Sequence, residues 1–204
     1  MQDTNLEITG GELAAMQDTS FFDVKAAVMK KISAALAGLK DQISENVSQY
    51  ERQSPGHVFD HPGKISRGEN YRGYPYLVLD YPRNFNRDEV FAYRCMFWWG
   101  HHFSYTLHVS GSYYEKATDN FIRNYSMLKL DDVFVCVNAQ PWEYHFETGN
   151  FLPASQVDPV KLLEGKTGSG RFIKLSLRTG LHRWNEIKTD GLRAFDLFSR
   201  VLYS

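Results

Sequence analysis

Apolar side chains recur at three- and four-residue steps along a long stretch near the start of the chain. The stripe begins just after Ser20 and continues to about Arg52, and its members are Phe21, Val24, Val28, Ile32, Leu36, Leu39, Ile43, Val47 and Tyr50. This spacing predicts one amphipathic helix, capped by Ser20 and Asp23 and about 50 Å long, which is longer than a domain of this size is wide. The helix therefore either breaks near Gly38 or overhangs the domain and packs against a second copy of the chain.

Shorter patterns predict the remaining elements. Similar stripes predict helices at 112–128 and 190–202, the second capped by Asp190, and Asp158-Pro159 predicts a short helix that ends at Leu163. Alternating or continuous apolar runs predict strands at 64–67, 74–81, 89–99, 102–109, 133–138, 142–146 and 171–179.

The order of these elements indicates the fold class. The predicted strands follow one another in hairpins instead of alternating with helices, which favours an α+β fold. We expect a single domain at 19–204, with an antiparallel or mixed sheet of about five to seven strands and the N- and C-terminal helices on one face. Residues 1–18 are expected to form a loosely ordered arm with a helical turn at 12–16.

The segment from Asp88 to Gly111 is unusually rich in aromatic residues and histidines. It predicts two strands joined by a two-residue type II′ turn at Gly100-His101. A turn of this length sets a register in which Trp99 opposes His102. One face of the hairpin then carries aromatic side chains on one strand and polar ones on the other, as many ligand grooves do. The predicted binding residues on this aromatic-polar face are Tyr93, Phe97, Trp99, His102, Thr106 and His108, with Arg178 from a later strand. A longer turn would exchange the two faces.

Two arginines extend this hypothesis. Arg178 belongs to a basic and aromatic cluster at 171–184, a composition that suits an anionic or planar ligand but also an ordinary exposed sheet face. Arg94 is predicted on the core face of the hairpin, where it would need a carboxylate partner, for which Asp80 or Glu143 could serve.

Composition narrows the functional classes. The 204-residue chain is 43% hydrophobic and 15% aromatic, which is typical of a packed globular domain. Its net charge of -1 offers no overall attraction to phosphate backbones or anionic membranes, so we expect neither nucleic acid nor a membrane as a partner. Cys95 and Cys136 lie in apolar runs and are expected to be buried, reduced thiols. The start of the chain has no signal-peptide pattern and no run is long enough to span a bilayer, so a cytoplasmic location is predicted.

Two further motifs concern catalysis. His57, Asp60 and His61 in a Pro/Gly-rich loop could supply metal ligands, with His102 or His108 completing the set, which would indicate a metal-dependent hydrolase. Gly165-Lys166-Thr167 shares letters with a phosphate-binding loop, but Val160 stands where that motif requires a glycine, and we reject it.

The sequence therefore leads to a ranked set of hypotheses. The first is a protein without a cofactor that binds a small anionic or aromatic molecule, or a protein partner, on the aromatic-polar face. The alternatives are the metal-dependent hydrolase and a structural module that forms a homodimer through its N-terminal helix and has no pocket. Whether the protein is an enzyme stays open.

Overall fold

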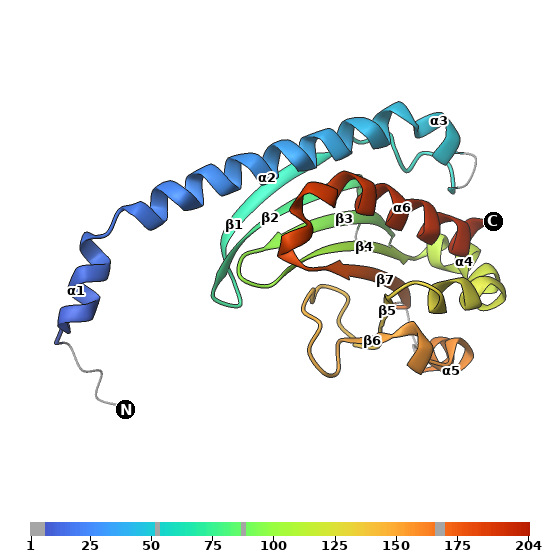
Figure 1. Ribbon diagram of the computed structural model, residues 1–204. Coiled ribbons are helices and arrows are strands. Elements are labelled where there is room, and N and C mark those ends of the chain that lie inside the picture. Colours follow the sequence, from blue (N-terminus) through green and yellow to red (C-terminus); the bar gives the residue numbers. More distant parts are fainter. Residues whose placement is uncertain (1–6, 52–53, 87–88, 166–169) are drawn as a thin grey trace.

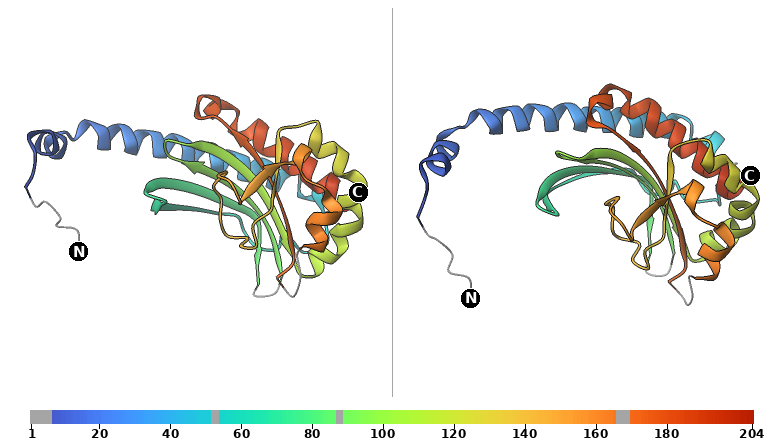
Figure 2. Two further views of the ribbon diagram at one scale, coloured as in Figure 1. Left: turned by 90° about the horizontal axis from the view of Figure 1, so that it is seen from below. Right: turned by 60° about the horizontal axis from the view of Figure 1, so that its bottom comes forward.

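A curved antiparallel sheet forms the centre of the computed structural model, which describes residues 7–51, 54–86, 89–165 and 170–204 (Figures 1 and 2). Its strands lie in the order β1-β2-β3-β4-β7-β5-β6, and every neighbouring pair is antiparallel. They are β1 (Lys64–Tyr71), β2 (Tyr74–Phe85), β3 (Val90–Trp98), β4 (His102–Ser110), β5 (Val133–Cys136), β6 (Phe151–Pro153) and β7 (Phe172–Thr179). The predicted α+β fold with an antiparallel sheet is confirmed.

Three helices cover one face of this sheet, and shorter helices lie at its margins (Figure 1). The covering helices are α2 (Ser20–Glu45), α4 (Ser112–Asn124) and α6 (Ile187–Tyr203). The shorter ones are α1 (Gly10–Gln17), α3 (Val47–Tyr50), α5 (Pro159–Glu164) and the 3-10 turns η1 (Tyr125–Lys129), η2 (Ala154–Gln156) and η3 (Leu181–Glu186).

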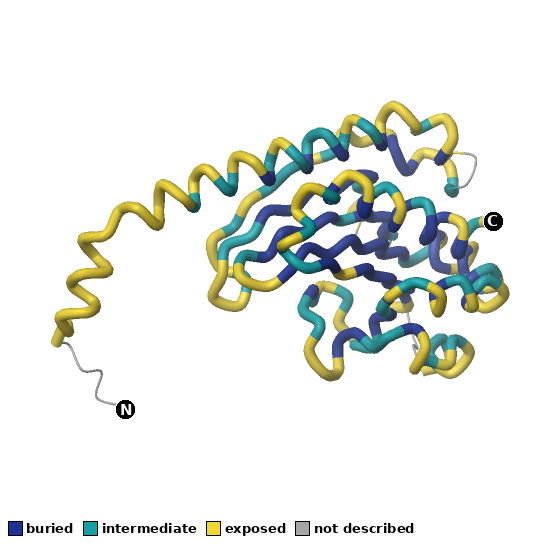
Figure 3. The backbone as a smooth tube through the Cα atoms, in the orientation of Figure 1, coloured by how far each residue is buried: buried dark blue, intermediate teal, exposed yellow. Residues whose placement is uncertain are grey.

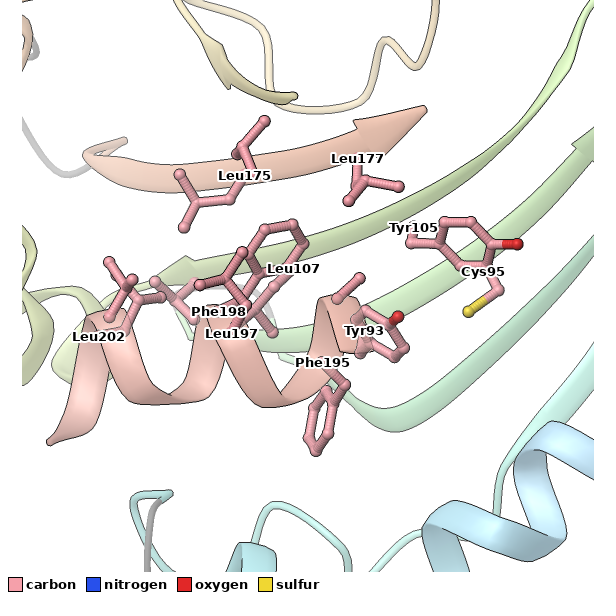
Figure 4. Close-up of a cluster of buried hydrophobic side chains, with 14 of the residues drawn as sticks. Tyr93, Cys95, Tyr105, Leu107, Leu175, Leu177, Phe195, Leu197, Phe198 and Leu202 are labelled. Atoms are coloured by element: carbon pink, nitrogen blue, oxygen red, sulfur yellow. The ribbon is translucent and has the colours of Figure 1, made fainter. Parts of the chain in front are cut away.

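The main hydrophobic core lies between α6 and strands β3, β4 and β7 (Figure 4). Phe195 of α6 is fully buried, and its ring lies 4.8 Å from that of Tyr93 and 4.7 Å from that of Tyr50. α6 can approach α2 closely at Gly191, because a Cβ atom there would stand only 2.5 Å from Cδ2 of Leu39. The two helices therefore pack closely against each other on this face of the sheet.

Helix α2 has two unlike halves. It continues unbroken through Gly38, which excludes the first of the two alternatives, a break at that residue, and its C-terminal half buries Ile32, Leu36, Leu39 and Ile43. The N-terminal half projects beyond the sheet and is largely exposed (Figures 1 and 3). The predicted overhang therefore exists.

The start of α2 is capped differently from the prediction. Thr19 occupies the N-cap position and makes no side-chain capping bond. Oδ1 of Asp18 instead accepts the Ser20 N–H at 2.8 Å. The predicted helical turn in the arm is α1, whose Thr9 and Glu12 form a complete capping box; residues 1–6 of the arm lie outside the described residues.

The turn between β3 and β4 has three residues instead of the predicted two. Trp98 pairs with His102, Phe97 with Phe103 and Cys95 with Tyr105. Gly100, at the centre of the turn, has φ +75°, a conformation that glycine adopts without strain. The predicted register is wrong by one residue. Side chains of β3 and β4 that were predicted to share a face of the sheet therefore lie on opposite faces.

Two further predictions of local structure are wrong. Residues 142–146 form no strand, because β5 pairs with β6 across a long loop at 137–150. Asp190 is buried inside α6 and accepts a hydrogen bond from Nη2 of Arg183 at 2.8 Å, so it does not cap the helix. In the part of the chain that the structure describes, no helix has the length and apolar character needed to cross a bilayer.

Candidate functional site

The corrected register divides the predicted binding residues between the two faces of the sheet. Tyr93 and Phe97 lie in the core on the helix-covered face, and Tyr93 donates a hydrogen bond to the carbonyl oxygen of Gly191. The opposite face carries His102, Thr106, His108 and Arg178. A single aromatic-polar face, as predicted, does not exist, because the extra turn residue Trp99 brings Phe97 opposite Phe103.

The opposite face is polar along β4 and β7, but it is not open. His102, Thr106 and His108 are all buried, and the hydroxyl groups of Thr106 and Ser176 lie 2.8 Å apart. The loop at 137–150 lies over this face, on the side of the sheet away from the helices (Figure 2). Thr106 and His108 are closed off by the loop, whereas His102 also borders a pocket at the edge of this face, lined by His101, Arg178, Thr179 and Gly180.

Cationic and aromatic contacts hold the loop in place. Nζ of Lys174, which is fully buried, donates to the carbonyl oxygens of Pro141 and Glu143 and lies 4.0 Å from the ring centroid of Tyr144. The Tyr71 hydroxyl accepts the Tyr144 N–H at 2.8 Å. At the edge of the same face the guanidinium of Arg178 lies over Phe134 and Phe146 at about 5 Å, an arrangement in which a cation stabilises the packed rings.

An ion pair lies under the same loop. Nε and Nη2 of Arg94 donate to the two carboxylate oxygens of Asp80 at 2.7 and 2.9 Å. Asp80 is one of the two partners that the sequence suggested, although Arg94 lies on the loop-covered face and not on the predicted core face. The guanidinium also lies over the ring of Tyr144, 4.7 Å from its centroid. The carboxylate and the ring together stabilise the positive charge of Arg94, which burial alone would destabilise.

Burial also controls the titratable groups that could act in catalysis. Burial is the main cause that lowers the pKa of His102 to about 4, and the neighbouring charges of Arg178 and His101 add to it. Nε2 of His102 has no hydrogen-bond partner among the described residues, so no acceptor stabilises a proton on that nitrogen. Burial raises the pKa of the Cys95 thiol far above its usual range, which keeps the sulfur protonated and poorly nucleophilic. Both cysteines are buried and free.

The predicted metal ligands do not converge. Nδ1 of His57 lies 3.3 Å from Oδ2 of Asp60, and both side chains are largely exposed in their loop. Within residues 7–51, 54–86, 89–165 and 170–204 no group of three or more His, Cys, Asp or Glu side chains is placed to hold a metal ion. The rejected Gly165-Lys166-Thr167 motif falls partly outside the described residues, since Lys166 and Thr167 are not placed.

An apolar groove lies at the end of the sheet, on the helix-covered face. Its volume is about 520 Å³, and it is bounded by the overhanging part of α2, the β3–β4 turn and η3. Its lining residues are Val24, Val28, Lys31, Ile32, Phe97, Trp99, Gly100, Phe103, Leu181 and Trp184. The groove opens to solvent where Val24 and Trp184 are 58% and 51% exposed. Two of the predicted binding residues, Phe97 and Trp99, thus line one candidate site.

Aromatic contacts shape the floor of this groove. The rings of Phe97 and Phe103, paired across the β3–β4 hairpin, lie 5.4 Å apart. Trp99 stands against Phe97 at 5.9 Å and against Phe21 of α2 at 6.0 Å, each edge to face. The partly buried Trp99 ring therefore joins the sheet to the overhanging helix and fixes the width of the groove.

Sequence reasoning missed most of the groove lining. The sequence pattern places Val24, Val28 and Ile32 only in the helical stripe, and Trp184 only in the basic and aromatic cluster at 171–184. The signal that could have found the groove is the excess length of the stripe, since side chains beyond the sheet edge have no core to enter. Comparison of the chain with protein-family models, with curated proteins and with solved structures finds no match.

Proposed function

We propose that this protein is a binding protein whose groove takes the apolar side chains of an amphipathic protein segment. The observation that carries the proposal is the groove itself, with its volume of about 520 Å³ and its two tryptophans, Trp99 and Trp184. Recognition grooves of this kind gain most of their affinity from a few aromatic anchors that become desolvated when the partner binds.

The lining favours a protein segment over a small polar molecule. Among the described residues that line the groove, Lys31 supplies the one charged side chain, and the other side chains are apolar or belong to the two tryptophans. Small-molecule sites usually combine an apolar wall with several placed polar groups that orient the ligand. An amphipathic helix needs only an apolar trough, into which it inserts side chains three and four residues apart.

The test uses two tryptophans that are exposed to almost the same extent. Trp184 lies in the groove and is 51% exposed, whereas Trp142 lies in the loop on the other face and is 50% exposed. Anilinonaphthalene sulfonate, a fluorescent apolar probe, is titrated against dilute full-length protein. We expect Trp184→Ala to weaken probe binding at least about tenfold, and Trp142→Ala to leave it unchanged.

The control separates binding in the groove from adsorption to exposed tryptophan. Equal weakening by the two substitutions, or weakening by neither, would show that the groove is not a binding surface. Thermal unfolding of each variant confirms that it is folded, which is expected because both side chains are half exposed and substitutions at such positions change stability little.

A further inference from the structure

We infer that the partner segment is the N-terminal arm of a second copy of this chain, and that two copies exchange arms about a two-fold axis. The arm is defined here as residues 7–23, which comprise α1 and the first turn of α2. The inference rests on the proposed function of the groove and names its occupant.

Helix α1 makes up most of the arm and is exposed, whereas Phe21 at the end of the arm lies against Trp99 of the same chain. None of the residues of α1 is buried, and the arm exposes Ile8, Leu13, Met16, Phe21 and Phe22 (Figure 3). An isolated helix of eight residues is shorter than the roughly 12 to 15 residues that give marginal stability in water. Exposed apolar side chains on so short a helix indicate that it is stabilised by docking.

Length matches between the arm and the groove. The eight residues of α1 span about 12 Å, and the nine residues of α2 from Val24 to Ile32, which form one wall of the groove, span about 13 Å. Leu13 and Met16, one turn apart, lie on one face of α1 and can enter the groove together. The two segments therefore have the length needed for each α1 to lie against the groove wall of the other copy.

Charge is complementary over the same two segments. Residues 7–24 contain the four carboxylates of Glu7, Glu12, Asp18 and Asp23 and no lysine or arginine. Residues 25–40 contain the four lysines Lys25, Lys30, Lys31 and Lys40 and no acidic residue. Antiparallel alignment places the acidic arm of one copy along the basic segment of the other, whereas parallel alignment would set like charges side by side.

The direction of the arm favours exchange over closure within one chain. Only Asp18 and Thr19 separate α1 from α2, and α1 lies apart from the sheet in each view (Figures 1 and 2). A reciprocal exchange uses the same surfaces on both copies and closes the assembly at two.

The first experiment measures the oligomeric state of the full chain by analytical ultracentrifugation. We expect a dimer at about 100 µM, and at least a tenfold higher dissociation constant for either of two variants. The arm variant carries Leu13→Glu and Met16→Glu, and the groove variant carries Trp184→Glu. Leu130→Glu, at a side chain that is 88% exposed and belongs neither to the arm nor to the groove lining, is the matched control and should dimerise like the natural chain.

A mixing experiment tests the exchange itself. The arm variant keeps an intact groove and the groove variant keeps an intact arm, so an equimolar mixture restores one of the two contacts. Dyes attached to Ser204→Cys in each variant should show energy transfer in the mixture and in neither variant alone. The natural cysteines are buried and will not be labelled.

The outcomes separate this inference from the proposed function. A natural chain that is monomeric at about 100 µM, or a dimer that both variants leave intact, overturns the exchange. Probe binding to the arm variant then decides the groove independently: binding that Trp184→Ala abolishes keeps the proposed function, and no binding removes both. Energy transfer in the mixture alone supports the exchange.

Discussion

On one face of the sheet, three helices bury an almost wholly apolar surface; on the other, an irregular loop covers histidines, hydroxyl groups, a lysine and an ion pair. Phe195 and Leu39 represent the first face, where packing is non-directional and scales with the apolar area removed from water. Lys174 and Asp80 represent the second, where each of these two buried charged groups depends on a particular partner.

The difference between the faces explains where an opening can exist. On the loop-covered face a gap would leave buried polar groups without partners, at a cost of roughly 1–3 kcal/mol each. On the helix-covered face a gap costs only the contacts that are missing. The apolar groove beside Trp99 lies at the end of the helix-covered face, where α2 continues beyond the strands.

The largest expected effect is on the helix-covered face. Phe195→Ala removes a fully buried ring that contacts Tyr50, Phe59 and Tyr93, and should lower the free energy of unfolding by about 3–5 kcal/mol. Urea denaturation, followed by circular dichroism, measures the loss. Leu130→Ala, at a side chain that is 88% exposed, should change stability by less than about 0.5 kcal/mol. Equal losses at the two sites would contradict this account of the core.

A smaller effect is expected at the ion pair on the loop-covered face. Asp80→Asn leaves the Arg94 guanidinium without its carboxylate and should cost about 2–3 kcal/mol, below the value for a fully buried pair because 23% of the Arg94 side chain is exposed. Replacing both partners, by Asp80→Leu with Arg94→Met, should recover most of that loss in the same urea denaturation assay. Additive losses would show that the two residues act independently.

The fold was largely predictable because periodicity determines which elements form. The α2 stripe, the strand at β7 with its two faces, and the C-terminal helix follow directly from steps of three to four or of two residues. The hairpin register failed because it was derived from turn chemistry at Gly100. The apolar pattern predicts the register better than the turn does, because of the two registers only the observed one places Phe97, Phe103 and Tyr105 on one face.

The candidate site was less predictable because it depends on where elements meet. Val28 and Trp184 are about 150 residues apart in the sequence. They line one groove only because α2 and η3 cross the same end of the sheet. The sequence also gives no sign that a loop covers His102 and His108, because residues 142–146 of that loop have the composition of a strand but are irregular in the structure. Long-range packing, not local pattern, decides both features.

The smallest expected effect is a pH dependence that belongs to the loop-covered face alone. The pKa of His102 is about 4 in the folded protein and about 6.5 in the unfolded chain. Between these values the unfolded state binds the extra proton, so stability is full above pH 6.5 and falls as the pH decreases. Between pH 7 and 5.5 this histidine should account for a loss of about 1 kcal/mol. Urea denaturation at the two pH values measures it.

His102→Leu should remove that contribution and flatten the stability profile, whatever it does to stability at pH 7. The remaining slope in the variant includes His145, whose pKa burial also lowers, so the comparison is the difference between the two profiles. Leu130→Ala, at an exposed side chain that carries no titratable group, should leave the profile of the natural protein unchanged. If His102→Leu leaves the slope as steep as before, protons reach this histidine in the folded state, and the loop does not close that face of the sheet as tightly as its contacts imply.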